Sequence, residues 1–452
     1  MGRWSALVRQ PNFAALLTAG GASLAAPTAS LVVISWALSH AYPDVANGQS
    51  YAALALAFLG LSSTVPTLVA AVFSGTLADR VDRNYLMRLV NLVAMAATIA
   101  IAAILVARPE MPVVVPGANG LYLPLWVLLI YPFWAAETTA VTIFRPAFNA
   151  SLPRVVARPQ LGTANGLVYA TALLLSIVAS LVASGILAWV GWGLALIIPV
   201  AFFLGTQLAL GLLRADLAPR PEGVRRPFLK EALDGYRYLW VRRDLFELTV
   251  SALAINFFSA VAFVELSLYA TFSLGISNAI LLGALISGGS LGAAAGTLLV
   301  NRFRFEQRAG RFLAVLTVCQ GLTVLALGFI HSIWLALPTM FLFGLFPGMF
   351  MTVFLATIQA TVPNQTLGRV LAADEVGSYG LVPVGQWAGG LLTASAGVSV
   401  AYVSAGIGTA AIGGLMAAVR NLRSLRFDPL EPVESSGAEA PPAVATADPI
   451  GS

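Results

Sequence analysis

The chain has 452 residues, of which 58% are hydrophobic and only 10% are charged, and its mean hydropathy is +0.85. This composition excludes an ordinary water-soluble fold. The net charge of +5 needs no nucleic-acid partner, because membrane topology accounts for it, and the single Cys319 excludes an intrachain disulfide and a cysteine metal site.

Apolar segments long enough to cross a membrane recur along nearly the whole chain. A hydrocarbon core of ~30 Å requires about 20 helical residues at ~1.5 Å each. Twelve segments have this length: 12–38, 51–78, 85–107, 121–149, 162–189, 192–213, 246–274, 278–300, 311–330, 333–360, 370–396 and 398–419. The first follows a polar leader and is too long for a signal peptide, so we expect it to be retained. We predict an all-α membrane protein with twelve transmembrane helices.

The basic residues between these segments lie on one side of the predicted membrane. Cytoplasmic loops retain Lys and Arg, whereas short translocated loops exclude them. With the N-terminus inside, Arg108 is the only basic residue that falls outside, and Arg145 lies at the inner end of the fourth segment. Both termini are therefore expected in the cytoplasm. The strong preference for Arg over Lys is typical of a GC-rich genome, and we expect a prokaryotic cytoplasmic membrane.

Two short sequence motifs occur twice and divide the chain into halves. Residues 142–153 (TIFRPAFNASLP) and 352–363 (TVFLATIQATVP) share Thr, Phe, Ala and Pro at the same spacing, and each closes an even-numbered segment. Gly75-Thr-Leu likewise recurs as Gly296-Thr-Leu. Transporters are often built from such repeats. We predict a six-helix bundle over 1–213 and a second over 246–425.

Two stretches of the chain outside the predicted bundles are polar. Residues 214–245 carry apolar side chains at helical spacing with basic residues between them, which predicts a cytoplasmic linker with an interfacial helix on the anionic inner leaflet. Residues 426–452 are rich in Pro, Ala, Glu and Ser, and this composition is typical of a disordered tail.

Particular motifs are more specific than composition. The run GTLADRVDRN, from Gly75 to Asn84, forms a charged hinge between the second and third segments. The first half also contains FRPAFNASLPRVV, and the second half contains Gly368-Arg-Val and Pro383-Val-Gly. With these motifs the chain resembles the major facilitator superfamily, and within it the drug-exporter branch of macrolide-efflux and enterobactin-exporter-like proteins.

The hinge motif predicts a latch between the halves. Gly75 allows close helix approach, and the Asp79 carboxylate can face the positive N-terminal end of a nearby helix. In the resembled family this is the eleventh helix, so Asp79 would hold the cytoplasmic ends together in the outward-open state. Arg145 would be the third member of the latch. Arg80 and Arg83 would anchor the hinge at the headgroups, whereas Asp82 stands where many members have Gly. The alternative is a solvated turn.

Two carboxyl groups are expected near the middle of the membrane. Glu137 lies in the fourth segment and Glu265 in the seventh, and the resemblance places both helices beside the central cavity. Ionisable groups within spanning segments are rare and often functional, and a low-dielectric site favours their reversible protonation. Both are candidates for proton coupling or substrate binding. The alternative for each is a carboxyl group hydrogen-bonded between helices with no transport role.

The expected cavity lining is apolar and aromatic. The resemblance implies that the first, fourth, seventh and tenth helices line the cavity, and Met and aromatic side chains accept bulky lipophilic molecules. The candidate lining residues are Trp36, Trp134, Asn256, Phe258, Met349, Phe350 and Gln359. The alternative is that these side chains face lipid or pack within the bundles.

No nucleotide-binding P-loop and no HExxH or GxSxG motif is present in the sequence, so an enzyme is not expected and no cofactor or metal is predicted. We expect a monomeric exporter of a lipophilic or amphipathic compound, either a drug or a secreted metabolite such as a siderophore, driven by proton antiport. The missing arginine motif of the fourth helix and Gly-Pro motif of the fifth weaken the antiport interpretation. Alternatives are an uncoupled lysolipid carrier or facilitator and a non-transporting membrane sensor or scaffold.

Overall fold

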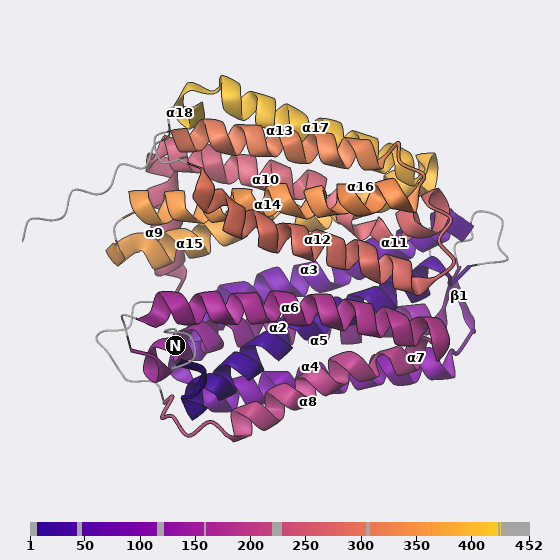
Figure 1. Cartoon of the computed structure of the whole chain (residues 1–452), viewed down its shortest axis with the longest axis horizontal. Coiled ribbons are helices and arrows are strands. Elements are labelled where there is room, and N and C mark those ends of the chain that lie inside the picture. The colour runs from indigo at the N-terminus through magenta and orange to yellow at the C-terminus, as the bar shows by residue number, and fades with distance from the viewer. Residues whose placement is uncertain are drawn as a thin grey trace, which may run out of the picture.

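A computed structural model describes residues 7–42, 48–114, 122–157, 160–218, 228–303, 308–362, 364–423 and 425. The long helices form two bundles that lie side by side, the N-terminal one in indigo to magenta and the C-terminal one in pink to yellow (Figure 1). The disordered tail predicted for residues 426–452 lies outside the described residues.

The N-terminal half contains six spanning segments and one short hairpin. Its elements are α2 (Pro11–Ser39), α3 (Gly48–Arg80), α4 (Arg83–Ala107), β1 (Pro112–Val114), β2 (Tyr122–Pro124), α5 (Leu125–Val155), α6 (Leu161–Trp189), α7 (Trp192–Ala195) and α8 (Ile197–Gly211). The strands pair antiparallel, with Val113 opposite Leu123. This hairpin was not predicted, and it takes the first residues of the predicted 121–149 helix because Pro124 is the N-cap of α5.

The C-terminal half follows the linker helix α9 (Phe228–Val241). Its elements are α10 (Arg243–Val264), α11 (Leu266–Leu268), the π-helix η2 (Tyr269–Ser273), α12 (Ala279–Leu299), the 3₁₀-helix η3 (Val300–Arg302), α13 (Ala309–Leu327), α14 (Ile333–Thr361), α15 (Asn364–Tyr379), α16 (Val382–Ala396), α17 (Val398–Ala418) and α18 (Arg420–Arg423).

The twelve predicted segments all correspond to helical regions, but three of them are interrupted. The sixth is broken at Leu196, between α7 and α8. Eleven helices in the described part of the chain are long and apolar enough to span a membrane. The remaining segment, the eleventh, predicted at 370–396, is built from α15 and α16, which are separated at Gly380 and Leu381. The seventh segment breaks at Glu265, between α10 and α11. The nearly all-helical fold is therefore confirmed, with two discontinuous spans in the C-terminal half.

Small residues determine how closely the helices approach. A Cβ atom on Gly292 of α12 would overlap the carbonyl of Phe341 in α14, and one on Gly344 would overlap the carbonyl of Gly289. Lipid is as apolar as a leucine side chain, so helices in a membrane associate through close packing of this kind. The glycines of α12 and α14 therefore hold these two helices together along their length.

Each bundle has two distinct ends. The arginine-rich end carries the start of α2, the α3–α4 hinge, α9, α15 and α18, on the left of Figure 1, and the hairpin end carries β1, α7 and α11, on the right. The positive-inside rule predicts that the arginine-rich end is cytoplasmic.

The two halves meet toward the hairpin end. Along α3 and α16, Ser50 Oγ donates to the carbonyl of Ala394 at 2.6 Å, and Thr64 Oγ1 donates to Gln386 Oε1 at 2.9 Å. Gly390 of α16 lies directly against Ala57 of α3.

A second contact between the halves joins α6 and α12. Gly283 lies against Ser184, and Ser287 Oγ donates to the carbonyl of Ile177 at 3.3 Å. Small and hydroxyl-bearing side chains at both contacts let the halves close the hairpin end tightly.

The halves part toward the arginine-rich end. The second half of α3 exposes Val65, Val69 and Phe73 at 46%, 57% and 58%, on one helical face. Whereas α3 packs along α16, it scarcely touches α15. If the arginine-rich end is cytoplasmic, this conformation is the inward-facing one.

This packing predicts that a side chain at Gly283 will open the hairpin end. In Gly283→Val, the new side chain would overlap Ser184, so α6 and α12 must separate. We expect longer distances between spin labels at Val190 and Ser277, measured by double electron-electron resonance in a Cys319→Ser background.

The matched control is Gly185→Val, since a Cβ atom at Gly185 of α6 meets open space. Its label distances should equal those of the parent protein. Equal distances in Gly283→Val and Gly185→Val would show that this contact does not hold the hairpin end closed.

Candidate functional site

Glu137 lies inside the N-terminal bundle. Its side chain, on α5, is fully buried, and its Oε2 accepts a hydrogen bond from Thr98 Oγ1 of α4 at 2.8 Å. Ser30 of α2, also fully buried, faces the same carboxyl, although the contact falls outside strict hydrogen-bonding geometry. Side chains from three helices of the N-terminal half therefore meet at this group.

Glu265 lies at the break in the seventh segment. It follows the last residue of α10, is fully buried, and neither of its carboxyl oxygens has a hydrogen-bond partner among the described residues. Thr393 of α16 faces the carboxyl but lies outside hydrogen-bonding geometry. A buried ionised carboxylate without a partner is strongly disfavoured, so the neutral form fits this conformation best.

The surroundings of Glu265 connect it to the closed hairpin end. On α16, Gly389 packs against the carbonyl of Val261 in α10, and the adjacent Gly390 packs against α3. Thr393 lies one turn further along the same helix. A change at the Glu265 carboxyl can therefore reach the contact between the halves through α16.

Aromatic side chains support the broken segment from the other side. The rings of Tyr269 and Tyr402 have centroids 4.9 Å apart, and the Tyr269 hydroxyl donates to the carbonyl of Ile330 at 2.9 Å. π-helical turns are rare and are frequently found at functional sites. The π-helix that begins at Tyr269, next to an unpartnered carboxyl, makes this region the strongest candidate site.

A third buried acid, Asp374 of α15, lies nearer the arginine-rich end. It accepts hydrogen bonds from Thr249 Oγ1 of α10 and from Ser378 Oγ, and Asn256 Nδ2 of α10 donates to the carbonyl of Ser378 at 3.0 Å. These bonds fix α15 to α10. Asp374 is thus a structural link, and its contact with Thr249 could not be predicted from the sequence because the two residues are 125 positions apart.

The hinge between α3 and α4 is well defined at two positions. Asp82 is the N-cap of α4, where its Oδ1 accepts from the backbone N–H of Tyr85 at 2.8 Å. Arg83 donates from Nη1 to the carbonyl of Ala150 at 2.9 Å and from Nε to the carbonyl of Ala78 at 3.3 Å. Arg83 therefore ties the hinge to the end of α5, and the predicted anchoring of Arg83 at lipid headgroups stays a prediction.

The remaining latch residues are placed as follows. Gly75 has open space around it, Arg80 is exposed, and the side chain of Asp79 lies outside the described residues. Arg145 is exposed on α5, within electrostatic range of Tyr379 at the end of α15. Because α3 scarcely touches α15 here, the latch itself, which belongs to the opposite conformation, stays a prediction.

Six of the seven predicted cavity-lining residues are buried, half-buried or bonded to a neighbouring helix. Trp36 and Trp134 are buried in the core shared by both halves, and Met349 and Phe350 are buried in the core of the C-terminal half. Phe258 is half-buried, with its ring against Gly408 of α17, and Asn256 is bonded to α15 as described. In this conformation, Trp36, Trp134, Met349 and Phe350 are therefore packing residues.

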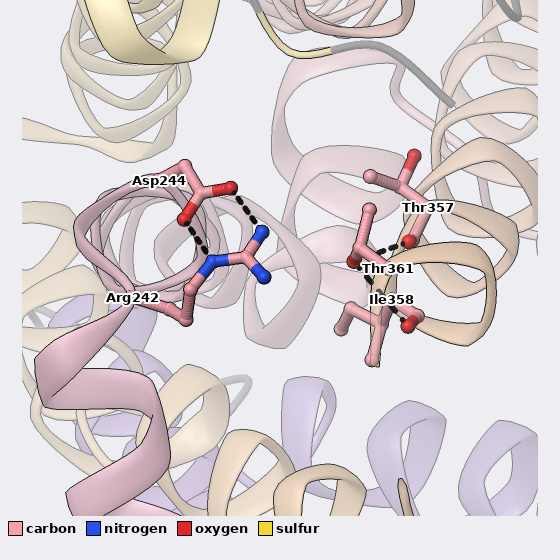
Figure 2. Close-up of polar contacts among 5 residues, drawn as sticks. All are labelled: Arg242, Asp244, Thr357, Ile358 and Thr361. Atoms are coloured by element: carbon pink, nitrogen blue, oxygen red, sulfur yellow. Dashed lines mark hydrogen bonds and ion pairs between the residues drawn. The ribbon is translucent and has the colours of Figure 1, made fainter. Parts of the chain in front are cut away.

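Gln359 is exposed near the end of α14. In the same turn, Thr361 Oγ1 donates back to the carbonyl of Thr357 at 2.8 Å (Figure 2). This is the common back-bond of a helical threonine to the carbonyl one turn earlier. Among the seven predicted lining residues, Gln359 is the one whose side chain is exposed, and it lies toward the arginine-rich end.

The arrangement of two six-helix bundles, closed at one end and parted at the other, is that of a major facilitator transporter. A family model described as "Transmembrane secretion effector" matches residues 2–445. The chain belongs to this family of major facilitator transporters. No curated protein matches the chain in sequence.

Solved structures share the fold at low sequence identity. A D-xylose-proton symporter is 14% identical with a TM-score of 0.68, covering 91% of this chain and 98% of its own. A peptide transporter, POT, in complex with sulfate is 13% identical with a TM-score of 0.68, covering 91% and 95%. A bacterial homologue of the human lysosomal transporter Spinster, in an inward-facing conformation, is 15% identical with a TM-score of 0.58, covering 93% and 98%.

The hydrogen bond to Glu137 predicts an energetic coupling that can be measured. Thr98→Val removes the donor and should lower the free energy of unfolding by about 1–3 kcal/mol, because a buried carboxyl oxygen is left unpaired. We expect this cost to shrink in the Glu137→Met background, because methionine offers no oxygen to accept the bond. A double-mutant cycle, read by unfolding in mixed micelles, should give a coupling of about 0.5–3 kcal/mol. Strict additivity would contradict the bond.

Proposed function

We propose that this transporter exports a lipophilic or amphipathic small molecule, a drug or a secreted metabolite such as a siderophore, from the cytoplasm of a prokaryotic cell by proton antiport. The observation that carries the proposal is the fully buried, unpartnered carboxyl of Glu265 at a helix break. Export agrees with the description of the family as secretion effectors.

The coupling step would be a change in the protonation of Glu265. Neutral, the carboxyl is compatible with burial beside α16 while the hairpin end is closed. Loss of the proton would place an unpaired charge against Thr393 and α16, which favours a rearrangement that admits water or a cationic partner. Since α16 also packs on α3, this rearrangement would loosen the contact between the halves at the hairpin end.

Substrate would enter between the halves from the arginine-rich end. The exposed apolar face of α3, formed by Val65, Val69 and Phe73, and the exposed Gln359 offer apolar contact with a few polar groups. Such a surface suits an amphipathic molecule that partitions from the inner leaflet.

The uncoupled lysolipid carrier or facilitator is the second candidate, and the hydrogen-bonded position of Glu137 favours it. Glu137 is enclosed by α2, α4 and α5, so its carboxyl can be purely structural. In that case only Glu265 would remain for coupling, and a carrier could function without either. A non-transporting sensor or scaffold stays a third alternative.

The proposal predicts that neutral glutamine variants lose coupling. In Glu265→Gln and in Glu137→Gln, proton-coupled efflux should be abolished while abundance and folding stay normal, because the amide keeps the shape but cannot release a proton. The measurement is proton release from acid-loaded everted vesicles with a pH-reporting dye, on addition of lipophilic cations, macrolides, siderophores or lysolipids.

Thr357→Val in α14 is a suitable control, since Thr357 is buried in a spanning helix but contacts neither glutamate in the described part of the chain. Undiminished coupled transport in both glutamine variants would refute antiport through these groups. Substrate movement without proton release in the parent protein would favour the uncoupled carrier.

The latch is tested independently of substrate identity. Asp79→Asn should slow cycling at normal abundance, since the neutral side chain no longer attracts the positive end of the eleventh helix. Spin labels at the arginine-rich ends of α3 and α15 should report a smaller closed population. Wild-type turnover and an unchanged closed population in this variant would refute the latch.

A further inference from the structure

The linker helix α9 is attached to the C-terminal half by one face. Gly235 lies so close to the carbonyl of Arg369 in α15 that any Cβ atom there would overlap it. Leu239 is buried with Leu245 and Leu248 of α10 in the same hydrophobic cluster. Because Gly235 packs against α15 and Leu239 packs with α10, α9 is expected to move together with α15 and the start of α10.

The opposite face of α9 is apolar, aromatic and basic. Trp240 and Val241 are 72% and 73% exposed, Tyr236 is 40% exposed, and the side chain of Arg237 is also exposed, as is that of Arg243, the first residue of α10. Exposed aromatic residues interspersed with arginine are typical of helices that lie at the membrane–water boundary.

The position of this face agrees with such a boundary. α9 ends at Val241, and the adjoining membrane span begins at Arg243. The ring of Trp240 meets that of Phe246 edge-on, with centroids 4.9 Å apart. Trp240 is therefore held level with the first turns of α10, where that helix enters the membrane.

The arginines at this junction are not equivalent. Arg242 is engaged by Asp244 through Nε–Oδ1 at 3.0 Å and Nη2–Oδ2 at 2.8 Å (Figure 2). Arg237 and Arg243 have no ion-pair partner within the described ranges. Over residues 220–244 as a whole, Asp244 included, the sequence carries seven basic residues against four acidic ones. The surface therefore fits a negatively charged partner.

We propose that the surface formed by Tyr236, Arg237, Trp240, Val241 and Arg243 binds anionic phospholipid headgroups, and that its occupancy holds α15 in the position seen here. Closing the arginine-rich end requires α15 to approach α3, and α9 would travel with it. Lipid that binds α9 better in the open position therefore favours that position. This regulation does not depend on the substrate or on proton coupling.

The test uses the full chain in nanodiscs of phosphatidylcholine with and without phosphatidylglycerol. Hydrogen exchange of the backbone amides in 364–379 reports the state of α15. Phosphatidylglycerol should slow this exchange in the parent protein. In R237Q/R243Q, the apparent affinity for phosphatidylglycerol should fall about fivefold for each arginine removed, and added salt should weaken the effect in the parent.

R420Q/R423Q is the matched control, because it removes two exposed arginines of α18 from the same end of the molecule. It should behave as the parent does. Trp240→Ala should also lose the lipid response, and Trp240→Phe should keep it. The proposal is overturned if phosphatidylglycerol leaves the exchange of α15 unchanged in the parent, or if R237Q/R243Q responds as R420Q/R423Q does.

Discussion

The fold depends on one constraint: within hydrocarbon, polar groups must find their partners inside the protein. Helices satisfy their backbone groups internally, which is why nearly the whole chain is helical. Buried side chains follow the same rule. Thr98 donates to Glu137, Thr249 and Ser378 donate to Asp374, and Asn256 donates to the backbone of α15. Except for the Ser378 bond, which lies within α15, each of these bonds also joins two helices within one half, so polar satisfaction and bundle packing are largely the same interactions.

Glu265 departs from this rule, and its position explains why the departure is tolerated. The helix breaks at this residue, and α16 passes close beside it with Gly389 against α10 and Gly390 against α3. An unpartnered carboxyl at a helix break between moving parts is costly when charged and inexpensive when neutral. The same physical property that makes it a poor structural residue makes it a suitable group for coupling.

The eleventh segment shows how one helix can serve both halves. Its part nearer the hairpin end, α16, is bonded to α3 through Gln386 and Ser50, whereas its part nearer the arginine-rich end, α15, is bonded to α10 through Asp374. The interruption at Gly380 and Leu381 separates these two attachments. Motion of one half relative to the other can therefore be taken up at this break, without bending a continuous helix.

The sequence predicted the number and placement of the spanning segments well, because length and hydropathy are properties of each segment alone. It also located Glu137 and Glu265, since an acid in an apolar run is conspicuous. It did not predict the partners of these acids, the β1–β2 hairpin or the break at Gly380. Those features depend on which helices become neighbours, and residues such as Thr98 and Glu137, 39 positions apart, carry no local signal of their contact.

The linker helix α9 illustrates both cases. Its apolar spacing indicated a helix, but only the packing of Gly235 on Arg369 shows that one face of this helix contacts α15. The face that remains is exposed among the described residues, and its tryptophan and arginines suit a charged lipid surface better than water.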